Sequence, residues 1–252
     1  MLSRLRLVVS LQLAKAYRLG VPVPAGRIVR VFNLNSRLVY RYLGALEGEG
    51  LVGRAGRGLY RVRASGRADA WAEYVLSQVR EGVHAYFQRV VPEVYYYLAE
   101  PPSIEWLGFA ERRLAVVDEA LRGRLSPPRG YRVVYASLRG RRWRYSWDLG
   151  AAVASPEQAL ADLLSHDPGF PAEQYLLLNL GRLDLAEVAR RATRRGLARL
   201  STFLAFLRVA TGRPLPQPFN YLALCDDRVL EERLGEYVSL VFGNGAAERR
   251  NL

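Results

Sequence analysis

Glycine, proline and asparagine divide the first 63 residues into five short segments, and their order constrains the fold more than any other feature. Three segments repeat apolar side chains near a 3.6-residue period, and two alternate apolar with polar side chains. The expected elements are helices at 2–19, 24–34 and 36–47, followed by strands at 51–55 and 58–63. Gly20 and the VPVP segment end the first helix, and Gly56-Arg57-Gly58 forms the turn between the strands.

The third expected helix has two different faces. The side chains expected on its buried face are Leu38, Val39, Leu43 and Leu46, and those expected on the outward face are Ser36, Arg37, Tyr40, Arg41 and Gly44. Three short helices followed by a hairpin is the plan of a winged helix-turn-helix domain, which we predict for residues 1–63. In such a domain the third helix enters the DNA major groove, about 12 Å wide. The alternative is a small structural domain whose arginines are simply solvated.

Basic residues are concentrated in the same part of the chain. Residues 1–67 contain 13 basic and 2 acidic side chains, which is +11 of the net +13 of the whole protein. A compact module with this charge repels itself unless a polyanion is its partner, so we predict binding to double-stranded DNA. The predicted DNA contacts are Arg27, Ser36, Arg37, Tyr40, Arg41, Arg54 and Arg57.

The remaining residues predict an α/β (α+β) protein, in which the winged helix precedes a mixed domain with a helical C-terminal part. Residues 64–70 are interpreted as a linker, and residues 71–252 as the second domain. Within it we expect helices at 71–91 and 103–122, a sheet at about 131–154, a helical part at 155–211 and a C-terminal tail at 212–252. The tail pattern fits either a strand or a helix.

Two further basic clusters lie in this second part. The first contains Arg139, Arg141, Arg142 and Arg144, interleaved with Trp143 and Tyr145, and the second contains Arg190, Arg191, Arg194, Arg195 and Arg199. Each is either a solvated face or a second contact, to DNA flanking the operator or to an acidic partner. For the second contact the predicted residues are Arg139, Arg141, Arg142, Arg144, Arg191, Arg194 and Arg195.

The sequence contains no pattern typical of an active site. Nucleotidyl transfer needs carboxylates for Mg²⁺ after a Gly-Ser turn, and the chain has no Gly-Ser dipeptide. Asp226-Asp227 are predicted to begin a helix or form a turn, and the consecutive residues Ser165-His166-Asp167 cannot orient one another as a triad. No zinc spacing, P-loop or dinucleotide motif is found. We therefore predict a protein that is not an enzyme, with no catalytic residue, metal or cofactor.

Composition favours a cytoplasmic protein. No run approaches the ~20 apolar residues of a membrane span. The N-terminus has arginines within its apolar stretch and no small-residue cleavage site, which argues against a secretory signal. The single cysteine, Cys225, excludes an internal disulfide and fits a reducing compartment.

The second half of the chain resembles a known family. The segment VASPEQALADLL at 153–164 is similar to a V-A-S/T-P-E-K-A-L-L-D-L-L signature, with Gln158 in place of the usual lysine. Residues 197–207 resemble the family's later R-L-G-Y-L-L helix. With the predicted winged helix, these motifs resemble the AbiEi-type antitoxins and transcriptional regulators. The start of the first motif also has helix-capping chemistry, with Ser155 as N-cap, Pro156 at the first position and Gln158 closing a capping box.

The resemblance implies a DNA-binding repressor of a type IV toxin–antitoxin operon, which binds inverted repeats. It also implies a C-terminal domain with nucleotidyltransferase-like topology that counteracts a cognate toxin. The alternative is a protein-interaction module that neutralises a toxin or acidic partner and binds DNA only weakly and unspecifically. The sequence leaves open whether the protein acts as a homodimer and whether a cognate toxin exists.

Overall fold

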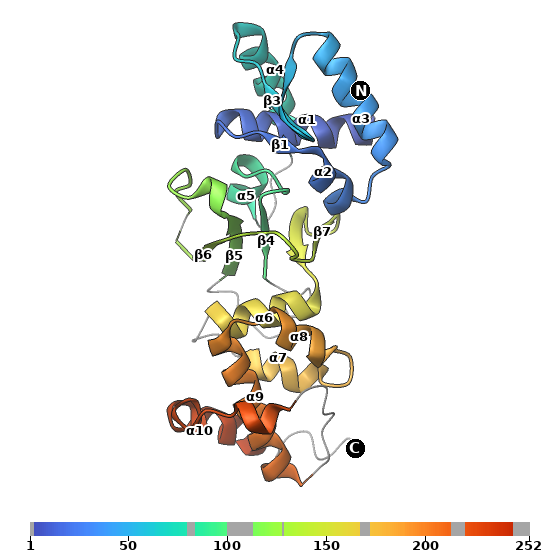
Figure 1. The fold of residues 1–252 in the computed structure, drawn as a ribbon. Helices are drawn as coiled ribbons and strands as arrows, with labels where there is room; N and C mark the ends of the chain where they lie inside the picture. Colours follow the sequence, from blue (N-terminus) through green and yellow to red (C-terminus); the bar gives the residue numbers. More distant parts are fainter. Residues whose placement is uncertain are drawn as a thin grey trace. The chain divides into compact units, whose positions relative to one another are not determined.

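The computed structural model describes residues 3–79, 84–99, 113–127, 129–166, 172–212 and 220–243. The described residues up to Ala154 form one compact unit, the first unit, and those from Ser155 form the second unit. Helices and sheets are mixed along the chain (Figure 1), which confirms the predicted α/β class. The predicted domain boundary at 64–70 is wrong, because the first unit continues through this segment to Ala154.

The first unit begins with three helices and a small sheet. In chain order these are α1 (Arg4–Arg18), β1 (Val23–Pro24), α2 (Ala25–Phe32), α3 (Ser36–Gly48), β2 (Val52–Gly56) and β3 (Leu59–Val62). The three helices and the hairpin agree with the elements predicted from the sequence. Strand β1 was not predicted; it adds to the hairpin so that the antiparallel sheet has the order β1-β3-β2. A proline is tolerated there because β1 is an edge strand.

The apolar faces of these helices form one core. Val9 and Leu13 of α1, Ile28 of α2 and Leu43 of α3 are almost completely buried. Spacings of three and four residues place such side chains on one face of each helix. Asn35 fixes the start of α3, because its side chain accepts a hydrogen bond from the Leu38 N–H at 3.2 Å. The periodic pattern of the sequence therefore determines this part of the fold.

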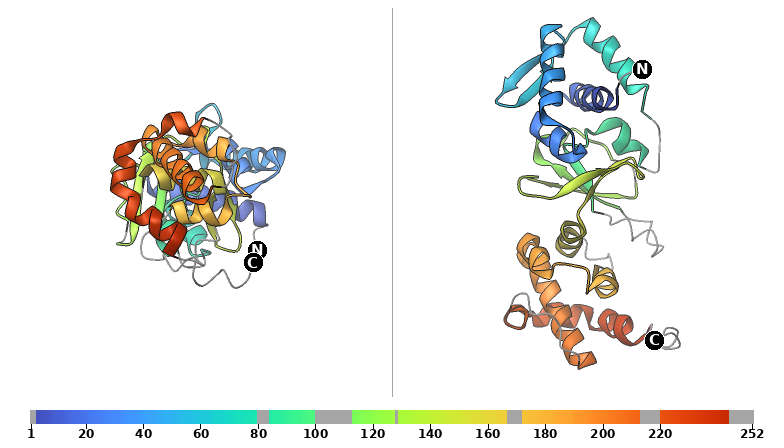
Figure 2. Two further views of the ribbon diagram at one scale, coloured as in Figure 1. Left: turned by 90° about the horizontal axis from the view of Figure 1, so that it is seen from below. Right: turned by 90° about the vertical axis from the view of Figure 1, so that its right-hand side faces the viewer.

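A five-stranded sheet completes the first unit. The elements are α4 (Gly66–Leu76), α5 (Ala85–Val90), β4 (Tyr96–Leu98), β5 (Arg113–Asp118), η2 (Glu119–Leu121), β6 (Tyr131–Ala136), β7 (Trp143–Ser146) and β8 (Ala151–Ala154). The strand order is β6-β5-β4-β8-β7. Strands β5 and β6 are parallel, as are β4 and β8, whereas β4–β5 and β7–β8 are antiparallel. Figure 2 shows α1 and α2 beside this sheet.

Three predictions for this region are corrected. The linker at 64–70 is largely helix, because Ser65 caps α4 by accepting a hydrogen bond from the Ala68 N–H. The single helix at 71–91 is wrong, since α4 ends at Leu76 and α5 begins at Ala85. The helix at 103–122 is also wrong where it is described: residues 113–118 form β5, a strand between two others, and residues 103–112 lie outside the described part. The predicted sheet at 131–154 contains β6, β7 and β8.

A buried ion pair joins α1 to the segment before β4. Lys15 Nζ lies 2.6 Å from Glu93 Oε1, and both side chains are at most 6% exposed. Gln12 donates a second hydrogen bond to the same carboxylate through Nε2. Nearby, the Arg30 guanidinium of α2 lies 4.6 Å from the ring centre of Trp143 in β7. Helices α1 and α2 are thus packed directly on the region of the sheet.

The second unit is helical in its described residues. It contains α6 (Pro156–His166), α7 (Ala172–Asn179), α8 (Leu185–Arg191), α9 (Arg194–Thr211), η3 (Tyr221–Leu224) and α10 (Asp227–Phe242). The first four agree with the predicted helical part at 155–211. The tail at 212–252, for which strand and helix were both considered, forms η3 and α10 in its described residues.

The predicted capping of α6 is half right. Ser155 Oγ accepts a hydrogen bond from the Gln158 N–H at 3.3 Å, as expected of an N-cap. The Gln158 side chain does not complete a capping box. Its amide donates to Asp162 and its oxygen accepts from Arg191, so it connects α6 to α8.

A charged cluster lies in the interior of the second unit. Glu173 of α7 accepts two hydrogen bonds from Arg199 of α9, and Arg233 of α10 lies 3.2 Å away through Nε. The hydroxyl of Tyr237 lies 3.5 Å from the same carboxylate. A buried carboxylate of this kind is tolerated because its charge is paired and hydrogen-bonded. Glu173 therefore holds three helices together.

Candidate nucleic-acid interface

Helix α3 presents one apolar and one polar face. Val39, Leu43 and Leu46 are buried, as predicted, where α3 packs on α1, α2 and β2. The predicted burial of Leu38 is wrong, because 38% of its surface is exposed. Position 38 precedes Val39 by about 100° around the helix axis, which turns it toward the solvent. The buried stripe is therefore narrower than the sequence pattern indicates.

The outward face of α3 consists of exposed residues one helical turn apart. Its members are Ser36, Arg37, Tyr40, Arg41 and Gly44, all exposed as predicted. Among the described residues, Arg37 and Arg41 have no hydrogen-bond or ion-pair partner. Between them, Tyr40 is 42% exposed and its ring centre lies 6.5 Å from that of Tyr60 in β3. Two guanidinium groups without a partner among the described residues thus flank an aromatic ring that packs on Tyr60 of the hairpin.

The hairpin adds two arginines beside this face. Arg57 lies at the turn, is exposed and has no side-chain partner in the described ranges. Arg54 is 71% exposed, and its Nε lies 3.4 Å from Glu47 of α3. An ion pair this exposed contributes only ~0–1 kcal/mol, so Arg54 can exchange Glu47 for another anion at little cost. Gly58 has φ +71°, a conformation that favours glycine and closes the turn.

Arg27 is not part of this surface, contrary to the prediction. Its Nη1 lies 2.7 Å from Asp118 Oδ2 at the end of β5 and 3.3 Å from the carbonyl oxygen of Val94. The side chain is only 26% exposed. Its guanidinium also lies over the ring of Tyr95. Arg27 therefore binds α2 to the five-stranded sheet, and it is removed from the predicted DNA contacts.

The basic cluster between β6 and β7 is partly structural. Trp143 is buried and Tyr145 packs on Phe32 of α2, so both aromatic rings take part in the packing of the first unit. Arg141 is half-buried and donates from Nη1 to the hydroxyl of Tyr97 at 2.7 Å. The exposed members of this cluster are Arg139, Arg142 and Arg144. The aromatic rings of this cluster therefore belong to the packing of the sheet, and a second contact of the exposed arginines stays a prediction.

The second cluster does not form one helical stripe. Helix α8 ends at Arg191 and α9 begins only at Arg194. Arg191 is hydrogen-bonded to Glu187 and to Gln158, and Arg199 is buried against Glu173. Arg190 is also paired with Glu187, at 2.6 Å. Arg194 and Arg195, at the start of α9, are exposed and have no such pair with any residue that the structure describes.

The residues considered for catalysis have structural roles. Asp226 caps α10 and Asp227 is its first residue, which confirms the predicted helix start. Ser165 Oγ accepts a hydrogen bond from the Thr193 N–H at 2.9 Å, and Asp167 lies outside the described residues. The described residues contain no group of three or more His, Cys, Asp or Glu side chains able to hold a metal.

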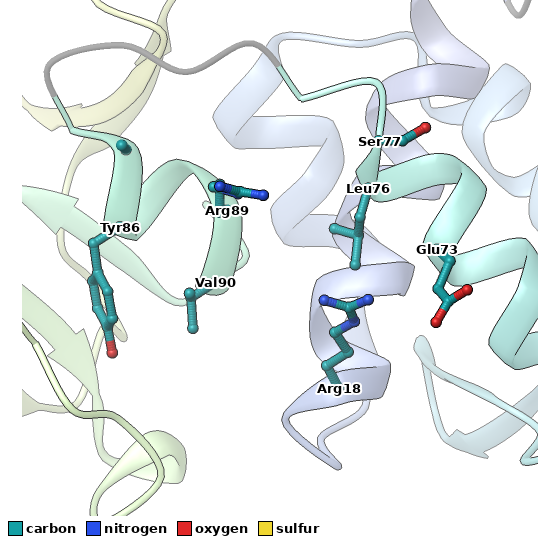
Figure 3. Close-up of a pocket in the computed structure, with 8 residues that line it drawn as sticks. Arg18, Glu73, Leu76, Ser77, Tyr86, Arg89 and Val90 are labelled. Atoms are coloured by element: carbon teal, nitrogen blue, oxygen red, sulfur yellow. The ribbon is translucent and has the colours of Figure 1, made fainter.

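A hollow of about 700 Å³ lies among α1, α4 and α5. Arg18, Glu73 and Arg89 are its charged lining residues, and Leu76 and Val90 provide apolar surface. Figure 3 shows Arg89 projecting from α5 toward the side of α1 and α4. One carboxylate and two arginines are not a donor set for a metal, nor do they form a nucleophile–base pair. We assign no chemistry to this hollow.

Two features of the first unit were not predicted from the sequence. The buried pair of Lys15 and Glu93 is one, and its only signal is that the single lysine of the chain falls in the apolar face of a helix. The exposed arginines Arg61 and Arg63 of the hairpin are the other. Their signal was the alternation of the LYRVR segment, which places both on the same face of the strand.

Comparisons with protein-family models, with curated proteins and with solved structures found no match. Within the described ranges, no helix has both the length and the apolar character needed to cross a membrane. Function is therefore inferred from the surface chemistry of the first unit.

Proposed function

We propose that this protein is a DNA-binding transcriptional regulator of the winged helix-turn-helix type, and that α3 binds in the major groove. One observation carries the proposal: Arg37 and Arg41 are exposed on either side of Tyr40 and have no partner among the described residues. Two exposed guanidinium groups on one helix face have only hydrogen-bond donors and positive charge to offer. A ligand that carries acceptors and negative charge would satisfy both groups. Arginine is the commonest side chain to read guanine, through its O6 and N7 atoms.

The geometry of α3 and the hairpin supports this proposal. The helix buries its apolar face in the protein and leaves its polar face for a groove wide enough to admit a helix. Gly44 on that face borders open space: a Cβ atom added to it would have no other atom within 4 Å, so a sugar–phosphate backbone can approach closely. Arg57 at the hairpin turn and Arg54 beside it are then available to phosphates.

The charge balance also supports a polyanionic partner. Residues 1–67 carry a net +11. Two of their cations, Lys15 and Arg27, are paired with Glu93 and Asp118 of the sheet region. The remaining excess is on exposed side chains, where repulsion is relieved by a bound polyanion. Counterion release from DNA would then supply a large share of the affinity.

The sequence resemblance extends the proposal to regulation. A repressor of the AbiEi type binds inverted repeats in its own promoter, for which a homodimer is the natural form. We infer that this chain regulates the operon in which it is encoded. A mobility-shift titration with its own promoter and with an unrelated duplex tests this. Tighter binding to the promoter is expected, and equal affinities for both duplexes would contradict a sequence-specific regulator.

A second candidate function is binding of a protein partner, such as a toxin, by the second unit. Leu234, Val238 and Phe242 lie four residues apart on α10 and are 45%, 42% and 54% exposed. An exposed apolar stripe on a helix is a frequent feature of protein interfaces. Co-purification with the product of the adjacent gene tests this function. Val238→Asp should abolish the association, and its persistence in this variant would exclude the stripe as the interface.

A further inference from the structure

A groove of about 530 Å³ lies where the hairpin meets the end of α1. Its lining residues include Tyr17, Gly53, Arg61 and Arg63. Arg54 also borders it but is paired with Glu47 of α3, and the lining contains no carboxylate. A volume in this range is typical of sites for small molecules. The groove is therefore a cationic cavity of ligand size.

The pairing of β2 with β3 shows which face of the hairpin bears these arginines. Gly53 is paired with Arg61, and Arg54 is paired with Tyr60. Directly paired residues point to the same face and neighbours alternate, so Gly53, Arg61 and Arg63 share one face of the hairpin. Tyr60 and Arg54 point to the other face, where they contact Tyr40 and Glu47 of α3. The pair of Arg61 and Arg63 thus lies on the face away from α3.

Gly53 gives Arg63 its position. A Cβ atom at Gly53 would lie 2.9 Å from Arg63 Nε and 3.4 Å from Nη2, so the guanidinium lies directly over the glycine backbone. Arg61, opposite Gly53, and Arg63 have no hydrogen bond or ion pair with any residue in the described part of the chain. Two neighbouring guanidinium groups without a counter-charge repel each other unless an anion lies between them.

We propose that Arg61 and Arg63 bind a phosphate group in this groove, on the face of the hairpin opposite to α3. Guanidinium groups match phosphate oxygens through paired hydrogen bonds, and two of them satisfy more than one oxygen of the same group. The phosphate comes either from a free phosphorylated molecule of about nucleotide size or from the backbone of a bound duplex. This site is separate from the outward face of α3 and does not depend on it.

The test uses the full-length protein and three variants. Arg63→Gln removes one guanidinium group. Gly53→Ala keeps the Arg63 guanidinium but displaces it from its position over the strand, because the added Cβ atom would lie 2.9 Å from Arg63 Nε. Arg182→Gln removes an exposed arginine of the second unit and is the matched control. Calorimetric titrations measure the affinity for two free phosphorylated ligands, inorganic pyrophosphate and ATP. Fluorescence anisotropy measures the affinity for a labelled DNA duplex, whose backbone is the other source of phosphate. Circular dichroism confirms that each variant is folded.

Each outcome decides the proposal. A loss of about tenfold or more in affinity for pyrophosphate or ATP in both groove variants, relative to Arg182→Gln, supports a free phosphorylated ligand. The same loss for the duplex alone supports the DNA backbone as the source. Affinities of both groove variants equal to the control for all three probes would overturn the proposal. An Arg37→Ala/Arg41→Ala variant that keeps wild-type pyrophosphate binding but loses DNA separates this site from the α3 face.

Discussion

Lys15 Nζ and Glu93 Oε1 lie 2.6 Å apart in the interior of the first unit, where α1 packs on the segment that leads into β4. The pair connects residues 78 positions apart in the chain. It is one of the contacts that join α1 to the region of the five-stranded sheet within the first unit.

Removal of one member of this pair should be strongly destabilising. Glu93→Gln leaves the Lys15 ammonium buried without a counter-charge, and the free energy of unfolding should fall by ~3–5 kcal/mol. The double variant Lys15→Met/Glu93→Gln removes both charges and should recover most of this loss. Urea unfolding followed by tryptophan fluorescence measures both. A double variant no more stable than Glu93→Gln would contradict the role of the buried charge.

Arg27 should matter for stability and not for base recognition. Arg27→Ala removes the ion-pair partner of Asp118, so the free energy of unfolding should fall by ~1–3 kcal/mol. The relative affinities for different duplex sequences should remain those of the wild type, measured below the unfolding range. A change in preferred sequence without a loss of stability would return Arg27 to the DNA contacts.

The interior cluster of the second unit should be separable from DNA binding. Glu173→Gln removes the carboxylate that Arg199 and Arg233 share. The free energy of unfolding of the second unit should therefore fall by ~3–5 kcal/mol. Affinity for DNA should not change, because α3 and the hairpin belong to the first unit. Thermal unfolding and anisotropy titrations are measured on the same sample. A parallel loss of DNA affinity at a temperature where the second unit is folded would contradict this separation.

Stability should decline at alkaline pH because of Tyr95. Burial raises the pKa of Tyr95 from its ordinary value of 10.0 to about 12. A group whose pKa is raised on folding stabilises fully below its unfolded pKa, and this contribution is lost as the pH rises through the folded-state pKa. The free energy of unfolding should therefore fall between about pH 10 and about pH 12. Burial also raises the pKa of Tyr145 to about 12, so both phenols contribute.

Urea unfolding at a series of pH values checks this decline. Tyr95→Phe should make it shallower, since one of the buried phenols with a raised pKa is removed, and it also loses the hydrogen bond to the carbonyl oxygen of Pro22. Tyr74→Phe, at an exposed position, is the control. The same alkaline slope in Tyr95→Phe as in the control would show that Tyr95 is not responsible.

The three helices and the hairpin of the first 63 residues could be predicted because they are specified by local signals, whereas β1 depends on its pairing with β3. Gly20, Asn35 and the turn at Gly56–Gly58 mark boundaries that no later part of the chain changes. Residues 113–118 were misassigned to a helix because a short apolar run fits a buried strand as well as a helix. Only the pairing of β5 with β4 and β6 decides between them, and that pairing depends on distant residues.

The site shows the same division between local and distant information. The exposed positions of Arg37, Tyr40 and Arg41 follow from the 3.6-residue period alone. Arg27 is held on the sheet by an ion pair with Asp118, which lies 91 positions away in the chain, and the sequence pattern does not indicate this contact. Trp143 stands among arginines in the sequence, yet the sheet buries it. Charge clusters therefore predict a surface only where the packing of the rest of the protein leaves them free.

The most direct test of the central claim is the affinity of an Arg37→Ala/Arg41→Ala variant for its own promoter, measured by fluorescence anisotropy over a range of salt concentrations. With about five phosphate contacts, the wild type should show a slope of log affinity against log salt of roughly −4 to −5. The double variant should lose ~2–6 kcal/mol of binding free energy, at ~1–3 kcal/mol per arginine, whereas Arg182→Ala should bind like the wild type. Wild-type affinity in the double variant would contradict α3 as the DNA-binding helix.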